Sequence, residues 1–329
     1  MISPMSATVQ CASGAFMVCP RNFGFNAQTA SSNVFQQLPP AASVDATAES
    51  ELAAAARVES QALCQALRSE GVQVLLAEDE AMPAKPDAVF PNNWLSLHGD
   101  GTLVLYPLLA ANRRLERRAQ LVEAVCEAFD FRPRRRIDLT AHEAEGRFLE
   151  GTGSLVLDHV ARVAYACESP RTDPALVHEW ARLMGFEAVI FDATDAQGRA
   201  YYHTNVMLWI GSRATVLCTE ALAESQRANV RARLLASGRE LIEIDRAAVA
   251  AFAGNLLELA SWDEALGDCS LLVMSASARA ALAGESLQRL SACVDTILAV
   301  PVPCIERVGG GSVRCMLTEV PHVAAELGA

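Results

Sequence analysis

A run of glycines followed closely by a cysteine is the part of this sequence whose residue types are best suited to chemistry. Residues 309–311 are glycines, and Arg314 and Cys315 follow them within four positions. Glycine backbone can bring its N–H groups close to a ligand, because no Cβ stands in the way. A thiol beside an arginine and near such donors lies where a thiolate is stabilised and a developing oxyanion is bound. The pattern predicts a cysteine nucleophile; the alternative is a small buried cysteine that begins a last core strand over 315–320.

The chain contains a repeat whose equivalent positions follow one another at regular separations. Asn93, Glu150, His203, Asn255 and Cys315 are separated by 57, 53, 52 and 60 residues. The units that they begin follow a common order of strand, turn, strand, helix and strand. A period of this length is typical of a cyclic or stacked architecture, in which one unit cannot bury its own apolar face. Five units would close a ring without exposed sheet edges, so we expect Asn93, Glu150, His203 and Cys315 to meet at its axis.

Apolar periodicity predicts the elements of these units and an α/β fold. Helices are expected over 46–69, 112–129, 221–235 and 278–290, with a further helix that ends at 184; strands are expected after residue 16 and over 72–76, 95–98, 102–106, 155–158, 161–167, 206–210, 215–218, 240–244 and 270–275. Ser277 is the expected N-cap of the last helix. We predict a single catalytic domain over 1–329, with its core over 15–320.

Composition excludes several classes of function. Of the 329 residues, 51% are apolar, which supports a substantial core, and the formal charge of −12 argues against a nucleic-acid partner. No apolar run is long enough to span a membrane, and residues 1–18 lack the features of a secretory signal, so we expect a cytoplasmic protein. The ten cysteines form no C-x-x-C pair and no Cys/His cluster, so neither a disulfide framework nor a metal site is expected.

Five motifs together resemble a known superfamily. They are F-G-F-N at 23–26, F-P-N-N-W at 90–94, L-E-G-T-G at 149–153, H-T-N at 203–205 and G-G-G-S-V-R-C-M at 309–316. From about residue 15 to about residue 320 the chain is similar to the guanidine-modifying superfamily of arginine deiminases, dimethylarginine dimethylaminohydrolases, amidinotransferases and succinylarginine dihydrolases. It most resembles the amidinotransferase-like, citrulline-utilisation hydrolase branch. The resemblance implies a pseudo-fivefold α/β propeller of strand-strand-helix-strand modules, in agreement with the repeat.

The resemblance also implies catalytic roles for three residues. Cys315 matches the nucleophile that attacks the guanidinium or ureido carbon and forms a covalent intermediate. His203 matches the general acid and base, although a lone histidine in an apolar segment is more often a satisfied core residue. Glu150 matches the acid that orients the histidine or binds a substrate nitrogen. No cofactor or metal is needed for this chemistry.

Four further residues are candidates for binding the amino-acid part of a substrate. Arg113 and Arg171 match arginines that hold the substrate α-carboxylate, and a guanidinium fork suits that role. The alternative for Arg113 is the solvated face of its helix, and Arg114 is close enough to be confused with it. The loop that contains Phe25 and Asn26 is expected to form a pocket wall, and the alternative is an ordinary loop.

The prediction of substrate class rests on two neutral side-chain amides. Arginine-processing members have aspartates where this chain has Asn93 and Asn205. A buried carboxylate facing a neutral ligand would be desolvated without compensation, whereas an amide both donates and accepts. We therefore hypothesise a ureido substrate, with citrulline hydrolysed to ornithine, ammonia and carbon dioxide through a covalent Cys315 adduct.

Two other functions stay open at this point. One is an arginine or methylarginine deiminase, or an amidinotransferase, acting on a guanidinium. The other is a propeller that binds an amino acid or a protein partner without chemistry. The expected partner is a small amino-acid substrate, and neither a nucleic acid nor a membrane is expected to bind. The oligomeric state is open, and a homo-oligomer is one of the alternatives.

Overall fold

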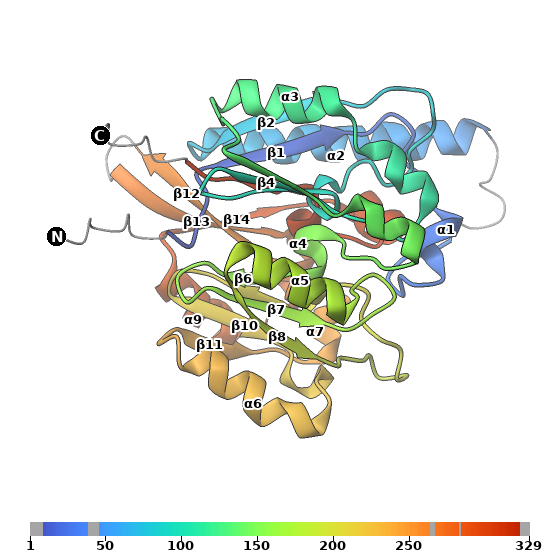
Figure 1. Cartoon of the computed structure of the whole chain (residues 1–329). Coiled ribbons are helices and arrows are strands. Elements are labelled where there is room, and N and C mark those ends of the chain that lie inside the picture. The colour runs from blue at the N-terminus through green and yellow to red at the C-terminus, as the bar shows by residue number, and fades with distance from the viewer. Residues whose placement is uncertain (1–8, 39–45, 264–266, 283, 323–329) are drawn as a thin grey trace, which may run out of the picture.

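The computed structural model describes residues 9–38, 46–263, 267–282 and 284–322 of the chain. In this part of the chain the strands form five three-stranded sheets, with the helices around them (Figure 1). Four sheets each consist of three consecutive strands: β3 (Leu95–Leu97), β4 (Thr102–Leu105) and β5 (Arg135–Asp138); β6 (Val156–Asp158), β7 (Val163–Cys167) and β8 (Glu187–Phe191); β9 (Leu208–Ile210), β10 (Ala214–Leu217) and β11 (Glu240–Glu243); β12 (Leu257–Asp263), β13 (Gly267–Ser275) and β14 (Thr296–Val300).

The topology is the same in each of these sheets. The middle strand pairs antiparallel with the strand before it and parallel with the strand after it. An antiparallel pair needs only a short turn, whereas a parallel pair needs a crossover, which helices supply here. The helical segments are α1 (Ala27–Ala30), α2 (Ala46–Ser69), η2 (Pro91–Asn93), η3 (Ala111–Glu116), α3 (Ala119–Ala128), η4 (Thr140–Glu145), α4 (Gly151–Ser154), α5 (Pro174–Met184), η5 (Thr204–Val206), η6 (Thr219–Ala221), α6 (Glu224–Leu235), α7 (Arg246–Ala250), α8 (Ala276–Ala281), α9 (Gly284–Cys293), η7 (Ile305–Gly309) and η8 (Val313–Met316).

The fifth sheet joins the two ends of the described chain. Its middle strand, β1 (Gly14–Cys19), pairs antiparallel with β15 (Thr318–Val320) and parallel with β2 (Gln73–Glu78). Gly14 lies opposite Val320. In this sheet β15 therefore occupies the position that, in the other four sheets, belongs to the strand before the middle strand. The mixed α/β fold is as predicted, and the five sheets fit the fivefold repeat.

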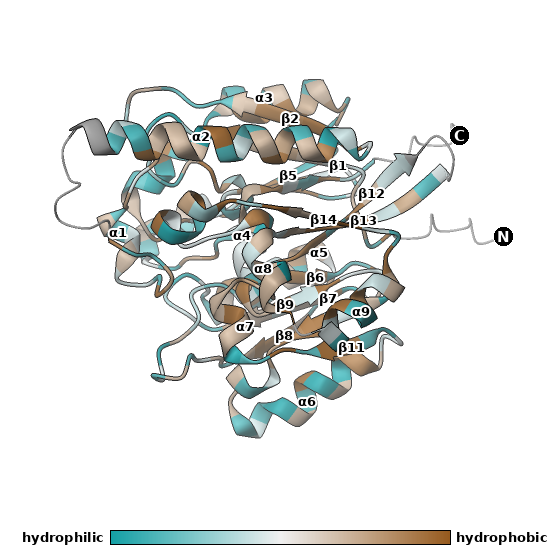
Figure 2. Cartoon of the chain, turned by 180° about the vertical axis from the view of Figure 1, so that it is seen from behind, coloured by the Kyte–Doolittle hydropathy of each residue, from teal (hydrophilic) through white to brown (hydrophobic). Residues whose placement is uncertain are grey.

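Local sequence explains why the helices begin and end where they do. In α5 the side chain of Asp173 accepts a hydrogen bond from the backbone N–H of Leu176, Pro174 occupies the first turn, and Gly185 ends the helix with a positive φ of 69°. The predictions of a helix over 46–69 and of one ending at 184 are confirmed. In Figure 2 the polar α6 is largely teal, whereas the strands of the neighbouring sheets are largely brown, as expected for a buried layer under a solvated helix.

Two predicted helices are in fact interrupted. The segment 112–129 consists of η3 and α3, with a break at Arg117 (φ −75°, ψ 80°), because the side chains of Arg113 and Glu116 turn into the interior instead of forming a solvated face. The segment 278–290 is divided between α8 and α9. The N-cap of α8 is Ser275, which accepts from the backbone N–H of Ala278; Ser277 was the wrong choice, because its hydroxyl donates to Glu306.

Other differences concern strands. Cys315 does not begin a strand, since it lies in η8 and β15 starts at Thr318. The strands β5, β8, β12 and β14 lie outside the predicted ranges. Three of them are the third strands of their sheets, and short strands after a helix carry little periodicity. Within the described residues, no helix is both long and apolar enough to cross a membrane.

Candidate active site

Short turns before the first strands of the sheets converge in the interior. Asn93 ends η2, Glu150 and His203 lie immediately before α4 and η5, and Cys315 lies in η8. The turn η2 contacts both α4 and η8, and α4 contacts η5. The structure thus brings together four residues that span more than 200 positions of the chain, each with an exposed fraction of 3% or less.

A small cavity lies among these residues. Its volume is about 10 Å³, which is room for roughly one water molecule. An amino acid is far larger, so its entry requires the lining residues to move apart. The cavity is lined by Asn33, Asp87, Phe90, Asn93, Arg113, Arg171, Tyr202, His203, Gly309, Gly311 and Cys315.

The imidazole of His203 is held by the carboxylate of Glu150. Nε2 of His203 lies 2.9 Å from Oε2 of Glu150, and Nδ1 is buried without a hydrogen-bond partner. Burial alone would raise the pKa of Glu150, but the charge of Arg171 and the hydrogen bond from His203 hold this pKa well below its usual range. An ionised carboxylate only accepts, so Nε2 carries the proton and Nδ1 keeps its lone pair. Burial lowers the pKa of His203 to about 4, although Glu150 opposes this shift, so the ring is neutral near pH 7 and Nδ1 can act as a base.

Two side-chain amides face the sulfur of Cys315. Nδ2 of Asn255 lies 3.4 Å from Sγ, and Nδ2 of Asn205 lies 3.6 Å from it. Asn205 therefore contacts the sulfur of Cys315 and does not line the cavity, which differs from its predicted place in a substrate clamp. The chain enters η5 directly after His203, so the side chain two residues later points in another direction.

The second glycine of the L-E-G-T-G motif, Gly153, is explained by crowding at this point. A Cβ on Gly153 would lie 2.6 Å from Nδ2 of Asn93 and 2.6 Å from Nδ1 of His203. Both atoms therefore border the space beside Gly153, and no larger residue fits without displacing one of them.

Arg113 is buried and holds several partners. It donates from Nε and Nη2 to the carboxylate of Glu116, at 2.9 and 3.0 Å, and from Nη1 to Oδ1 of Asn93 at 2.8 Å. Nη2 also donates to the backbone oxygen of Phe90. The alternative of a solvated Arg113 is therefore wrong, whereas Arg114 lies outside the cavity lining and donates to the backbone oxygens of Leu108 and Leu109.

Arg171 links the cavity to the N-terminal segment. It donates to Oε2 of Glu150 at 3.3 Å, to the hydroxyl of Ser32 and to the backbone oxygen of Thr29, and its guanidinium lies 5.0 Å from the ring centre of Tyr202. Tyr202 donates from its hydroxyl to the backbone oxygen of Gly310 at 2.6 Å. The glycine run is thus fixed by a residue next to His203.

Asp87 is the remaining charged group on the cavity wall. Its Oδ2 accepts from Nδ2 of Asn26 at 2.7 Å and from the hydroxyl of Thr29, whereas Oδ1 is buried without a hydrogen-bond partner. Asn26 thus contacts Asp87, which lines the cavity, but does not line the cavity itself. Phe25 packs against the apolar core around Phe23 and also lies outside the lining.

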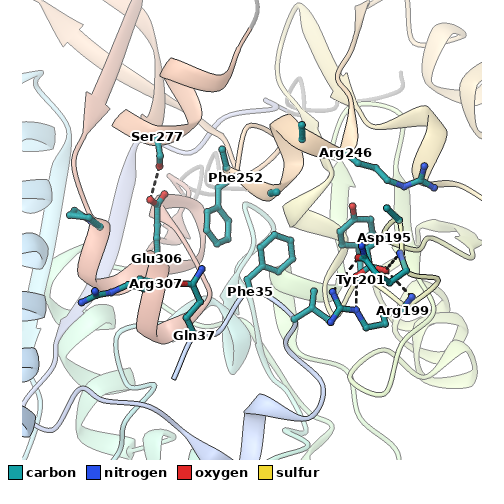
Figure 3. A pocket seen from close by; sticks show the side chains of 17 residues that line it. Phe35, Gln37, Asp195, Arg199, Tyr201, Arg246, Phe252, Ser277, Glu306 and Arg307 are labelled. Atoms are coloured by element: carbon teal, nitrogen blue, oxygen red, sulfur yellow. Dashed lines mark hydrogen bonds and ion pairs between the residues drawn. The ribbon is translucent and has the colours of Figure 1, made fainter. Parts of the chain in front are cut away.

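A second and much larger pocket, of about 690 Å³, lies beside this region (Figure 3). Phe35, Tyr201 and Phe252 form its aromatic part, with Phe35 and Phe252 ring centres 5.0 Å apart. Glu306 on its rim accepts from Ser277 and from Ser312 of the glycine-rich stretch. It shares no lining residue with the small cavity, and the candidate catalytic residues Cys315 and His203 line only the smaller of the two.

Comparison with known proteins identifies the family. A family model described as "N,N dimethylarginine dimethylhydrolase, eukaryotic" matches residues 19–322. The chain belongs to this dimethylarginine dimethylhydrolase family. It is therefore a member of the guanidine-modifying superfamily and a hydrolase of non-peptide C–N bonds. No curated protein matches the chain.

Solved structures share the fold of this dimethylarginine dimethylhydrolase family member. The N-terminal domain of ArgZ, an arginine dihydrolase from cyanobacteria, is 16% identical (TM-score 0.69; 94% of this chain and 98% of that chain), here as a cysteine-to-serine variant bound to substrate. A second ArgZ variant is covalently bonded to a reaction intermediate (TM-score 0.70, 15% identity; 94% and 98%). AgrE with L-arginine is 18% identical (TM-score 0.70), with 95% of this chain and 41% of AgrE covered. Dimethylarginine dimethylaminohydrolase with S-methyl-L-thiocitrulline is 14% identical (TM-score 0.63; 94% and 100%).

Three residues of this site were not predicted. Asn255 occupies the fourth of the five repeat positions, so the spacing alone could have suggested it. Tyr202 is adjacent to His203, but neighbouring positions in an extended segment normally face opposite sides. Asp87 lies six residues before Asn93, and nothing in the local pattern distinguishes it from a solvated turn residue. Among the described residues, no group of histidine, cysteine and acidic side chains could hold a metal ion.

Proposed function

We propose that the chain hydrolyses the ureido end of an amino acid, with citrulline as the substrate and Cys315 as the nucleophile. The observation that carries this proposal is the fixed orientation of the Asn93 amide. Arg113 can only donate, so the atom of Asn93 that it contacts at 2.8 Å is the oxygen. Nδ2 of Asn93 donates one hydrogen to Oδ1 of Asn92, at 3.0 Å. The second Nδ2 hydrogen is the polar group that Asn93 can offer to a ligand.

A ureido group is complementary to this arrangement. Its carbonyl oxygen accepts from Asn93, and its nitrogen can donate to the unpartnered Nδ1 of His203. A guanidinium carries only donors, so one of its N–H groups would face the N–H of Asn93. An unsatisfied polar group in a buried site costs about 1–3 kcal/mol. The Asn93 amide therefore favours the ureido substrate.

The other end of the cavity suits an amino acid. Asp87 has a buried carboxylate oxygen without a partner, which an α-ammonium group would pair. Arg171 and Arg113 line the same cavity and are the candidates for the α-carboxylate. Arg171 is the better placed of the two, because it makes three hydrogen bonds within the protein, whereas Arg113 makes four and has fewer N–H groups left for a ligand.

The proposed reaction has two stages. The sulfur of Cys315 attacks the ureido carbon, Nδ1 of His203 takes the thiol proton and passes it to the departing nitrogen, and ammonia leaves. The adduct is a thiocarbamate, Cys315–S–C(=O)–NH–R. Water, deprotonated by Nδ1 of His203, attacks its carbon; the C–S bond breaks and a carbamate is released, which loses carbon dioxide to give ornithine. One water is consumed for each ammonia and carbon dioxide formed.

We also infer that the five sheets form a closed pseudo-fivefold ring around this site. The pairing of β1 with β15 supports this inference, because it joins the ends of the described chain in one sheet. The contacts among η2, α4, η5 and η8 place the equivalent turns of different sheets together, as a ring would require.

Arginine is the second candidate substrate, and the family supports it. ArgZ is an arginine dihydrolase, and AgrE binds L-arginine in its structure. If this chain acted in the same way, two waters would be consumed and two molecules of ammonia would form with ornithine and carbon dioxide. A methylated arginine is the corresponding substrate of the family named by the matching model.

Parallel assays decide between these substrates. The purified protein and Cys315→Ala are incubated with L-citrulline, L-arginine and dimethylarginine, and ammonia, dimethylamine, citrulline and ornithine are measured. We expect ornithine from citrulline at the highest kcat/KM, and none from the variant. A higher kcat/KM on arginine or dimethylarginine would reject the ureido assignment.

A further inference from the structure

Asn255 is held rigidly next to the nucleophile, although it lies 60 residues before it. Its side chain is fully buried in the turn before β12. The backbone of this turn is pressed against η5, because a Cβ on Gly254 would lie 2.6 Å from the backbone oxygen of Val206. The backbone N–H of Asn255 donates to the oxygen of Phe252 at 2.8 Å, which closes the turn.

Backbone groups fix both ends of the Asn255 amide. Oδ1 accepts from the backbone N–H of Arg314 at 3.1 Å, and Nδ2 donates to the backbone oxygen of Asn205 at 3.0 Å. A backbone N–H only donates and a backbone oxygen only accepts, so the amide cannot be turned over. The second Nδ2 hydrogen is directed at Sγ of Cys315, at 3.4 Å.

We propose that Asn255 is a catalytic residue that stabilises the Cys315 thiolate through this N–H group. A hydrogen bond to an anion is roughly twice as strong as one to a neutral acceptor, so the donor favours the thiolate over the thiol. The same donor acts when the C–S bond breaks and its electron pair returns to sulfur. Because both partners of the amide are backbone atoms, no reorganisation is needed at either step.

Other charged and polar groups also face Cys315. Asn205 donates to the same sulfur, at 3.6 Å. The titratable groups that share its cavity are Asp87, Arg113, Arg171, Tyr202 and His203. The guanidinium of Arg314 turns away to the backbone oxygen of Leu317 and to Glu319. A change at Asn255 leaves the chemical identity of all these groups unchanged, and Asn255→Asp also keeps an acceptor for the backbone N–H of Arg314.

The test is the pH dependence of Cys315 alkylation by iodoacetamide, followed by mass spectrometry of the peptide that contains Cys315. The pH of half-maximal rate in the natural protein is the reference value. Asn255→Asp has the same shape but removes the donor and adds negative charge, and should raise this midpoint by about one to two pH units. Asn255→Ala removes the donor without adding charge, together with the contacts to the backbone of Arg314 and Asn205, and should raise the midpoint by about one unit. Asn229→Asp, at an exposed asparagine of α6 that does not line the cavity, is the matched control and should not move the midpoint.

An unchanged midpoint in a folded Asn255→Asp or Asn255→Ala protein would overturn the proposal. If neither variant folds, Asn255→Gln, which keeps the amide but displaces its N–H, takes their place, and an unchanged midpoint in it overturns the proposal in the same way. The proposal rests on one part of the proposed function, which is the role of Cys315 as the nucleophile. Alkylation needs no substrate, so failure to release ornithine from citrulline would reject the substrate and leave the Asn255 result standing.

Discussion

Nε2 of His203 lies 2.9 Å from Oε2 of Glu150, and Oε2 also accepts from Arg171 at 3.3 Å. One carboxylate thus fixes the tautomer of the base and neutralises an arginine on the cavity wall. The first prediction follows from this arrangement. Glu150→Gln can present an N–H to His203, which would force the proton onto Nδ1 and remove the base. We expect kcat/KM for ornithine release to fall by about 100-fold or more.

The control for this variant is Glu78→Gln. Glu78 pairs with Arg57 at the surface, away from the cavity, and the same chemical change there should leave kcat/KM within about twofold. Thermal unfolding of both variants is measured alongside. A Glu150→Gln enzyme with full activity would show that Glu150 does not set the tautomer.

Acidification should destabilise the protein through the histidines whose pKa is lowered by burial, which are His98, His159 and His203. Burial lowers the pKa of His98 to about 3 and that of His203 to about 4, from the ordinary value of 6.5. Above pH 6.5 the rings are neutral in both states and the stabilisation is complete. As the pH falls from 6.5 towards 4, only the unfolded chain takes up protons, so the free energy of unfolding decreases. Urea midpoints at pH 7.5 and 5 measure this decrease.

A variant separates the contribution of His98 from the rest. His98→Gln removes one of these titrating groups, so its urea midpoint should change less between pH 7.5 and pH 5 than that of the natural protein. His178 is exposed, and His178→Gln should leave the pH dependence as it is. Equal pH dependence in all three proteins would contradict the assignment to His98.

Gly153→Ala should damage the site more than the fold. Its Cβ would lie 2.6 Å from both Nδ2 of Asn93 and Nδ1 of His203, so at least one of them must move. A displacement of about 1 Å at a reacting group can cost roughly 100-fold in rate, and we expect a kcat loss of that order. Gly24→Ala is the matched control, because a Cβ there has no neighbour within 4 Å. Similar losses in both variants would show that crowding beside Gly153 is not the cause.

Asn93→Asp should shift the preference towards a guanidinium. The carboxylate keeps its contact with Arg113 but offers only acceptors to the ligand, so the ratio of kcat/KM for arginine to that for citrulline should rise by at least about 10-fold. Asn92→Asp places the same charge one residue away, outside the cavity lining, and should change the ratio much less. An unchanged ratio in Asn93→Asp would remove the main support for the ureido substrate.

Asp87→Asn should weaken binding more than chemistry. Loss of the charge that pairs with the α-ammonium is expected to raise KM by about 10-fold or more, with kcat little changed. A substrate that lacks the amino group, 5-ureidopentanoic acid, provides the control, since Asp87→Asn should not raise its KM further. If KM rises equally for both substrates, Asp87 does not bind the ammonium group.

Much of the site could be predicted from the sequence because the repeat is long and regular. Equivalent positions of similar units lie at equivalent places in a fold, so spacing alone brought Asn93, Glu150, His203 and Cys315 together. The helix over 46–69 was predicted to the residue, since a long periodic segment carries a strong signal. The break at Arg117 was missed, because the pairing of Arg113 with Glu116 inside the protein outweighs the helical pattern.

The sequence by itself thus determined the α/β class, the module order and the four central residues. The tertiary structure alone decided which way the side chains point and what they contact. It turned Asn205 and Asn255 towards the sulfur, committed Arg113 to Asn93 and Glu116, and left an oxygen of Asp87 and a nitrogen of His203 without partners. Spacing can predict that a residue lies in the turn before the first strand of a sheet. The orientation of its amide, however, is set by donors and acceptors from distant parts of the chain, and these become neighbours only when the sheets assemble.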